Sequence, residues 1–128
     1  MADSSLAKKL GLKPGKRALI LNAPDGYRAL LDPLPEGVDL TTTPDGTFDF
    51  VQLFAKNKAD LAAYAPAAMA AVKPGGMLGI SFPKKTSKIQ TDISRDTGWD
   101  VIQQAGWQGV FLISVDDVWS AMRFRPVG

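Results

Sequence analysis

The sequence predicts an α/β fold of three layers, in which helices cover both faces of a mostly parallel sheet. Three apolar segments of strand length, residues 17–21, 48–55 and 77–82, have few polar side chains. This is typical of central parallel strands that are buried on both faces. Segments with helical spacing lie between them, as in strand–helix–strand units. Two late strands, 107–115 and 118–124, have only a short turn between them, which predicts a C-terminal antiparallel hairpin.

The N-terminal half predicts two short helices and two strands. A first helix is expected to end at Gly11, ahead of the strand 17–21. Residues 22–26 break that strand, and the spacing of apolar residues predicts a second short helix over 27–34, which proline ends. A short strand follows at 38–42 and leads to the apolar strand 48–55.

The C-terminal half predicts two further helices. Asn57 is expected to cap an alanine-rich helix, because its side chain can accept a hydrogen bond from a backbone N–H of the first turn. Pro66 lies inside this helix and is expected to kink it or split it. After a basic loop at 83–90, another helix is expected to begin at Thr91 or Asp92.

Length and composition exclude several kinds of protein. The chain has 128 residues and a mass of 13.7 kDa, which predicts a single domain over residues 1–128. It contains no Cys and no His, so a zinc finger, a disulfide framework, a thiolate nucleophile and a Ser-His-Asp triad are all excluded. The net charge of +2 is too small to indicate a nucleic-acid-binding protein.

The hydropathy of the chain gives no indication of a membrane protein. The N-terminal residues are polar, and the apolar runs are too short for a leader or for a membrane span. We therefore expect a soluble, cytoplasmic protein.

Three segments of the chain resemble class I, S-adenosylmethionine-dependent methyltransferases. The segment LKPGKRALILN resembles their opening strand, FDFVQLF resembles their central strand, and VKPGGMLGISFP resembles their KPGG turn and the strand after it. The late hairpin also resembles their closing pair of strands. The resemblance implies a Rossmann-like, methyltransferase-like sheet in a reduced form, in which one strand and one helix of the full fold are missing.

The chain also resembles a narrower group, an uncharacterised bacterial domain-of-unknown-function family of short methyltransferase-like proteins. The segments that carry this resemblance are KKLGLKPG, NAPDGY, the FPKK loop and DDVWSAMRFR. The family implies no known activity.

The methyltransferase pattern is incomplete at the cofactor side. The enzymes have two or three glycines after the first strand, whereas residues 22–26 contain one glycine and include Pro24, which has no N–H to donate. The enzymes also have an acidic residue at the end of the second strand, where this chain has the threonines of 41–43. We therefore expect S-adenosylmethionine to bind weakly or not at all, and we expect no other cofactor.

The candidate binding residues follow from the rule that open α/β sheets bind ligands at the carboxyl ends of their strands. Four segments are expected to meet this condition: 22–27, 55–57, 83–88 and, if the hairpin starts on the same side, 116–117. The turn after the first strand and the basic loop with the hairpin turn supply Asn22, Asp25, Tyr27, Lys84, Lys85, Asp117 and Trp119. A pair of lysines beside one carboxylate and one aromatic ring would suit a small anion that has an apolar part.

Each of these residues also has a structural interpretation. The turn can simply lead the chain from strand to helix, the lysines can lie on a solvated loop, and the tryptophan can anchor the core. The spacing of the basic loop does not match a P-loop.

The sequence therefore predicts a small, non-enzymatic binding or interaction protein with a site for an anionic ligand. No catalytic residue and no metal ligand is assigned. One alternative is a minimal S-adenosylmethionine-dependent methyltransferase. Another is a structural homo-oligomer, with a homodimer interface on the apolar hairpin 107–125.

Overall fold

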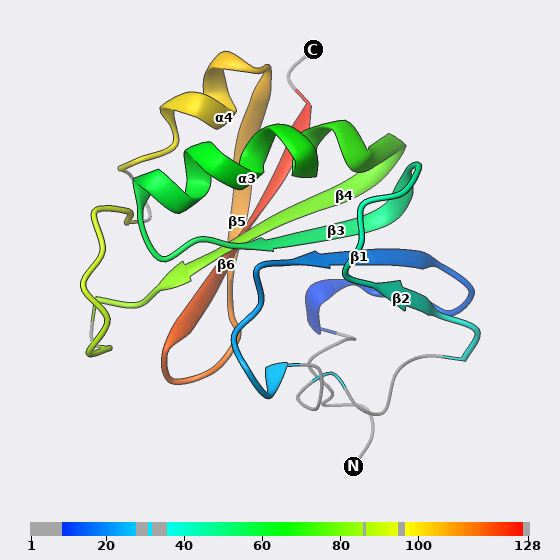
Figure 1. Ribbon diagram of the computed structural model, residues 1–128, viewed down its shortest axis with the longest axis horizontal. Coiled ribbons are helices and arrows are strands. Elements are labelled where there is room, and N and C mark those ends of the chain that lie inside the picture. Colours follow the sequence, from blue (N-terminus) through cyan, green and yellow to red (C-terminus); the bar gives the residue numbers. More distant parts are fainter. Residues whose placement is uncertain (1–8, 28–30, 32–35, 86, 95–96, 127–128) are drawn as a thin grey trace.

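The structure is a computed structural model that describes residues 9–27, 31, 36–85, 87–94 and 97–126. Within this part of the chain, six strands form one sheet in the order β2-β1-β3-β4-β6-β5 (Figure 1). β1 is parallel to β2 and β3, β3 is parallel to β4, and β6 is antiparallel to β4 and β5. The strands are β1 Arg17–Leu21, β2 Asp39–Thr41, β3 Phe48–Phe54, β4 Val72–Pro83, β5 Trp107–Ser114 and β6 Trp119–Pro126. The predicted mostly parallel sheet with a C-terminal hairpin is confirmed.

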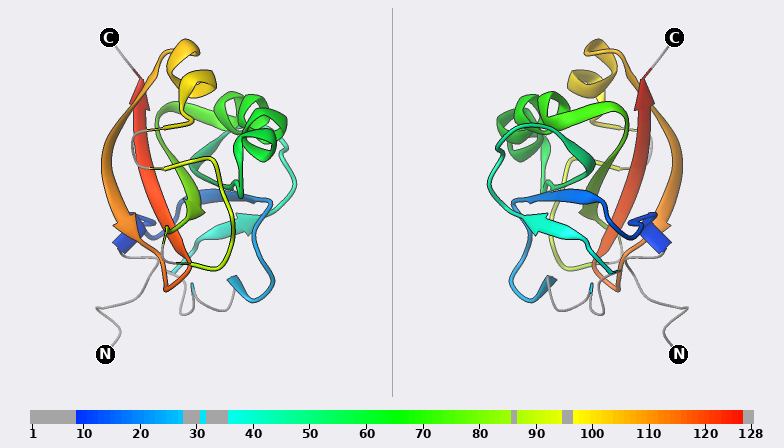
Figure 2. Two further views of the ribbon diagram at one scale, coloured as in Figure 1. Left: turned by 90° about the vertical axis from the view of Figure 1, so that its left-hand side faces the viewer. Right: turned by 90° about the vertical axis from the view of Figure 1, so that its right-hand side faces the viewer.

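Apolar side chains cover both faces of this sheet, as the three-layer prediction requires. The helices α3 (Lys58–Ala71) and α4 (Asp100–Gln104) lie against one face (Figures 1 and 2). Side chains that alternate along the strands pack toward them, among them Leu19, Val51 and Ile80. The intervening side chains pack on the opposite face in a second cluster, which includes Leu10, Leu12, Ile20, Tyr27, Leu31 and Phe54.

The helix α3 begins where the sequence predicts it. The Asn57 side chain accepts a hydrogen bond from the backbone N–H of Asp60 at 2.9 Å, so the predicted cap is confirmed. The expected division of the helix at Pro66 is wrong, because α3 runs on to Ala71. Pro66 and Ala62, which lies four residues before it, are both exposed, so the carbonyl group that loses its backbone partner can bond to water.

The helix predicted to begin at Thr91 or Asp92 is shorter than expected and begins later. It is α4, which spans only Asp100–Gln104. The Asp92 carboxylate accepts a hydrogen bond from the backbone N–H of Lys58 at 2.7 Å, so it caps α3 and does not start a helix of its own. The described residues between Asp92 and Trp99, which are 93–94 and 97–98, are not helical, and Ile93 among them is buried.

The first part of β4, which begins at Val72 directly after α3, depends on glycine. A Cβ atom on Gly76 would lie 3.0 Å from the carbonyl oxygen of Lys73 and 3.0 Å from a methyl group of Val72. The Lys73 ammonium forms an ion pair with Asp49 of β3, next to a shift in the β3–β4 register. The KPGG segment therefore fixes the position at which β4 joins β3.

The two short helices predicted in the N-terminal half lie largely outside the described residues. Lys9 and Leu10 are helical, and Gly11 follows with a φ of 88°, which suits a helix end. Tyr27 begins a helical segment whose next residues are not described. Among the described helices, none is both long and apolar enough to cross a membrane.

Candidate functional site

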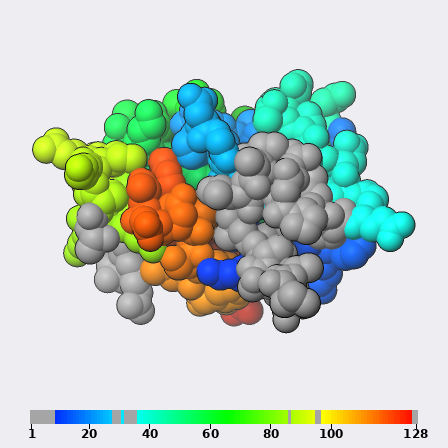
Figure 3. Space-filling model, turned by 90° about the horizontal axis from the view of Figure 1, so that it is seen from below, coloured from blue at the N-terminus to red at the C-terminus, as the bar shows by residue number. Residues whose placement is uncertain are grey.

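The parallel strands β1 to β4 all have their carboxyl ends on the same side of the sheet. β6 begins on that side because it is antiparallel to them. Three segments meet on this side: the turn 22–27, the loop that begins at Lys84, and the hairpin turn 115–118. Seen from below, the turn 22–27 and the hairpin turn lie side by side (Figure 3). The backbone N–H of Lys84 donates to the carbonyl oxygen of Val118 at 2.6 Å, which joins the basic loop to the hairpin turn.

A pocket opens between the ends of β1 and β2. Its volume is about 550 Å³, within the roughly 300–1,000 Å³ of small-molecule sites. The part of the chain that follows β1 supplies Ala23, Pro24, Asp25, Gly26 and Tyr27, and the strands and Leu31 supply the rest of the lining: Ile20, Leu40, Thr41 and Thr42. The pocket therefore combines aliphatic side chains and the side chain of Tyr27 with one carboxylate and the hydroxyl groups of two threonines.

The turn on one side of this pocket is held by Asn22. Asn22 has a φ of 58°, in the left-handed region that asparagine tolerates better than most residues. Its side-chain amide donates to the carbonyl oxygen of Phe54 at 2.9 Å, which ties the end of β1 to the end of β3. The donor that the sequence offered for a ligand is thus used inside the protein. On the same turn, a Cβ atom added to Gly26 would have no atom of the described residues within 4 Å, so the described part of the chain leaves the backbone there accessible.

Tyr27 is a buried anchor of the same turn. Its hydroxyl group donates to the side-chain oxygen of Gln52, and the Gln52 amide donates to the hydroxyl oxygen of Ser81 at 2.9 Å. Burial raises the pKa of the Tyr27 hydroxyl far above its usual value of 10, and the negative charge of Asp116 adds to this effect. Tyr27 therefore keeps its proton near neutral pH and acts as a fixed hydrogen-bond donor.

An aromatic row connects this turn with the hairpin. The ring of Tyr27 packs edge-on against Phe54 at 4.5 Å between centroids, and Phe54 packs against Trp119 at 5.0 Å. Trp119 is only 5% exposed, so it anchors the first residue of β6 in the core.

The predicted basic group is divided by the structure. The Lys84 ammonium donates to the hydroxyl oxygen of Ser114 at 2.7 Å, and the Lys9 ammonium donates to the Ser114 carbonyl oxygen at 3.0 Å. Lys85 is exposed and lines, with Lys88, a separate open hollow of about 600 Å³ along the loop 85–97. Asp117 is exposed at the hairpin turn.

Asp116, the neighbour of Asp117, has a clear structural role. One of its carboxylate oxygens accepts hydrogen bonds from the backbone N–H groups of Val118 and Trp119, both at 2.8 Å. These contacts form an Asx-type turn, which stabilises the reversal of the chain between β5 and β6.

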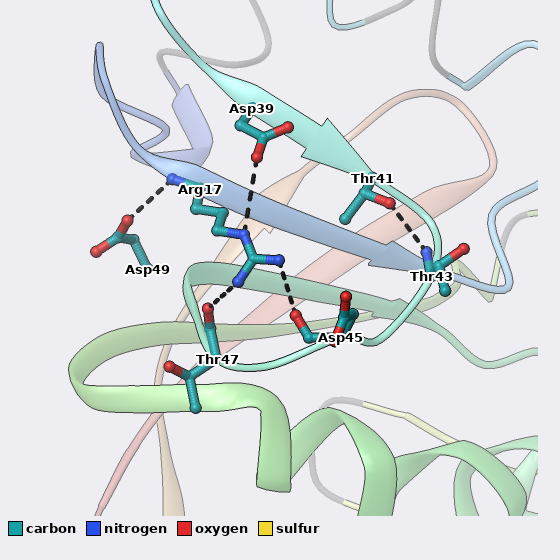
Figure 4. A network of polar contacts seen from close by, with 7 residues as sticks. All are labelled: Arg17, Asp39, Thr41, Thr43, Asp45, Thr47 and Asp49. Atoms are coloured by element: carbon teal, nitrogen blue, oxygen red, sulfur yellow. Dashed lines mark hydrogen bonds and ion pairs between the residues drawn. The ribbon is translucent and has the colours of Figure 1, made fainter.

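Arg17 stabilises the short strand β2 on the other side of the pocket (Figure 4). Its guanidinium group donates to the carbonyl oxygens of Asp45 and Thr47 at 2.7 and 2.9 Å, and it lies 3.7 Å from the Asp39 carboxylate. The Thr41 hydroxyl oxygen accepts a hydrogen bond from the backbone N–H of Thr43. These contacts keep the end of β2, with its two pocket threonines, beside β1.

Of the seven predicted site residues, the structure therefore brings Asp25 and Tyr27 together in the pocket lining, where Asn22 holds the turn but does not line the pocket. Lys84, Asp117 and Trp119 lie around the hairpin turn, and Lys85 lies apart from both groups. The sequence did not lead us to the pocket residues Leu40, Thr41 and Thr42. Open α/β sheets bind ligands at the carboxyl ends of their strands, and these three residues lie at that end of the second strand. Gln52 was also missed, and its signal is a polar residue inside an otherwise apolar strand.

No family model matches this chain, and no curated protein matches it. Solved structures do match, at low sequence identity. A SAM-dependent methyltransferase from Aquifex aeolicus has a TM-score of 0.62 and 16% identity, over 95% of this chain and 88% of that one. A complex of DhpI with SAH has a TM-score of 0.61 and 16% identity, over 98% and 84%. Ribosomal protein L11 methylase from Lactobacillus delbrueckii subsp. bulgaricus has a TM-score of 0.59 and 10% identity, over 96% and 76%.

These matches give the chain the fold of SAM-dependent methyltransferases, where SAM is S-adenosylmethionine. They also correct the prediction that the chain takes no cofactor, because proteins of this fold were solved with SAM or SAH, DhpI in both forms. The prediction relied on the glycine count after β1 and on the missing acid after β2. Neither signal shows that residues 23–27 and 40–42 line one pocket of suitable size.

Proposed function

We propose that this protein binds SAM in the pocket at the ends of β1 and β2 and is a small methyltransferase. The observation that carries the proposal is the pocket itself, because it lies at the carboxyl ends of neighbouring parallel strands and is large enough for a small-molecule cofactor. The shared fold supports the methyltransferase more than the non-enzymatic binding protein.

The residues that line the pocket fit the chemistry of SAM. Ile20, Leu31 and Leu40 offer an apolar surface for a purine ring. Thr41 and Thr42 carry hydroxyl groups that can exchange hydrogen bonds with a ribose. Asp25 is exposed and can accept hydrogen bonds from ribose hydroxyls or from the ammonium group of the methionine part.

The backbone near Gly26 completes the fit. The open space at this glycine allows the cofactor to approach the main chain closely. Pro24 still removes one donor from the turn, so fewer backbone hydrogen bonds are available than in a glycine-rich turn.

When bound, SAM supplies an electrophilic methyl group. The residues of this chain bind and orient SAM, and they hold the turn 22–27 in place. The hydrogen bonds from Tyr27 to Gln52 and from Gln52 to Ser81 keep the turn 22–27 fixed on the sheet. Tyr27 is protonated and bonded to Gln52, so we assign it a positioning role.

For the second substrate we propose a small anion, held near the hairpin turn by the basic loop. Lys84 is joined to this turn through its backbone, and the exposed Lys85 follows it directly. Ammonium groups suit phosphate or carboxylate. Substituting both lysines by Ala should weaken anion binding and leave the melting temperature nearly unchanged, since Lys85 is exposed and the bond from the partly exposed Lys84 to Ser114 is a surface contact, each contributing about 0–1 kcal/mol.

Calorimetric titration with SAM and with SAH tests the cofactor site. Thr42→Trp should block the pocket and abolish binding, because Thr42 is exposed and lines it. Thr43→Trp is the matched control, since Thr43 is exposed but lies outside the lining. Asp25→Asn should weaken binding by about tenfold, the loss of one charge-assisted hydrogen bond. Equal affinity of the two tryptophan variants would contradict the proposal.

A further inference from the structure

The strand β5 forms one edge of the sheet and is unusually apolar for an edge. Val110, Phe111 and Leu112 are 47%, 46% and 42% exposed, and Tyr64 on α3 is the other large apolar residue exposed to a similar degree in the described part of the chain. These three side chains are consecutive, so they lie on both faces of the strand. Edge strands of stable monomers are normally protected by charged residues or proline. The segment Trp107–Ser114 contains neither.

A hollow without charged side chains accompanies this edge in the described structure. Its volume is about 540 Å³, and it lies between the β5 residues and Trp99, Gln103, Met122 and Phe124. Its side chains are mostly apolar, and Gln103 adds a polar one. The exposed strand and the hollow lie side by side, and together we call them the β5 surface.

The backbone of β5 defines what can cover this surface. On the outer side of β5, every second residue directs its N–H and C=O groups away from β6. Another strand can form hydrogen bonds with this row of backbone groups. One end of the row is already used, because Lys9 donates to the carbonyl oxygen of Ser114. In the part of the chain that the structure describes, residues 108–113 have no partner strand on this side, and a register irregularity lies between Gly109 and Phe111.

We propose that β5 pairs with β5 of a second copy of this chain, antiparallel and around a two-fold axis. A strand without charged residues can face its own copy without like-charge repulsion. The charges beyond its ends favour the antiparallel arrangement. Arg125 lies across from Gln108 near the start of β5, and Asp116 and Asp117 follow its end.

Antiparallel pairing brings the arginine end of one copy to the aspartate end of the other. Parallel pairing would place arginine against arginine. Lys9 and Lys84 donate to Ser114 at the aspartate end and offset its two negative charges, so the antiparallel arrangement is favoured mainly because it keeps the two copies of Arg125 apart. The resulting interface is isologous, as in most homodimers. It lies at the opposite edge of the sheet from β2, so it does not depend on the proposed cofactor site.

Mass measurement by light scattering over a range of protein concentrations tests the dimer. The wild-type protein should show twice the 13.7 kDa of the chain. The Phe111→Lys and Leu112→Lys double variant should be a monomer with an unchanged circular-dichroism spectrum. Tyr64→Lys, the matched control on α3, should remain a dimer. A wild-type monomer at all concentrations, or a dimer that survives the double substitution, would overturn the proposal.

Cross-linking tests the position of the interface independently. Because the sequence contains no cysteine, a single introduced cysteine can form a disulfide only with another copy. Cysteine is introduced singly at Val110, Phe111 and Leu112, and Tyr64→Cys is the control. At least one of the three β5 variants should form a covalent dimer under mild oxidation much faster than the control. Equal rates at all four positions would refute pairing through β5.

Discussion

Gln52 is the residue that connects the pocket turn to the centre of the sheet. It is 1% exposed, and it accepts from Tyr27 while donating to Ser81. We expect Gln52→Leu to lower the free energy of unfolding by about 1–3 kcal/mol, because two buried polar groups lose their partner. Urea denaturation measures this, with Gln103→Leu on the exposed side of α4 as the control. Equal stability of the two variants would show that the buried hydrogen bonds of Gln52 do not contribute to the free energy of unfolding.

Asp49 makes the stability of the protein depend on pH in the acidic range. The backbone N–H of Arg17 and the ion pair with Lys73 hold the pKa of the Asp49 carboxyl below its usual value of 3.8. The ionised form is therefore favoured in the folded protein. The stability that it contributes is fully present above pH 3.8 and is lost as the pH falls through the lower pKa of the folded state.

Thermal unfolding between about pH 5 and about pH 2.5 measures this effect. The wild-type protein should lose more stability over this range than Asp49→Asn. The variant is less stable at neutral pH, and it has no carboxyl group at position 49 that could be protonated as the pH falls. Asp100→Asn, an exposed residue on α4, should follow the wild-type curve. Parallel curves for wild type and Asp49→Asn would show that this carboxylate is not coupled to folding.

At the scale of elements, the junction between α3 and β4 gives the sharpest prediction. Gly76→Ala places a Cβ atom against backbone from two sides, at 3.0 Å from the Lys73 oxygen and 3.1 Å from the Asp49 oxygen. Because neither atom can move freely, we expect a loss of roughly 1–3 kcal/mol. Gly79→Ala is the control, since no atom lies within 4 Å of its Cβ position. Chemical denaturation should show the lower stability of Gly76→Ala. If that variant were as stable as Gly79→Ala, the backbone could not lie as close to Gly76 as the structure has it.

Elements with strong local signals could be predicted from the sequence. The strands β1, β3 and β4 follow from apolar runs, and the start of α3 follows from Asn57. The helix predicted from Asp92 could not be placed correctly, because the carboxylate that would cap it is bound by Lys58, which is 34 residues away. Local patterns do not contain such a contact. The continuity of α3 through Pro66 depends likewise on solvent exposure, which only the fold determines.

At the scale of the whole molecule, the sheet places its two candidate surfaces at opposite edges. The pocket lies at β1 and β2, and the apolar edge strand β5 closes the other side. The turn 22–27 could be predicted as part of a site because it follows the first strand. The same rule includes Thr41 and Thr42 at the end of the second strand, but local sequence does not show that the distant Arg17 network holds this three-residue strand in place beside the pocket.

The central claim is that the pocket between β1 and β2 binds SAM. The most direct measurement is nuclear magnetic resonance of the uniformly ¹⁵N-labelled protein during titration with SAH, which reads every backbone amide except those of proline. The account predicts that the largest shifts occur in residues 20–27 and 40–42, with little change along β5. No shifts at millimolar SAH, or shifts that cluster in the loop 85–97 in place of the pocket, would contradict it.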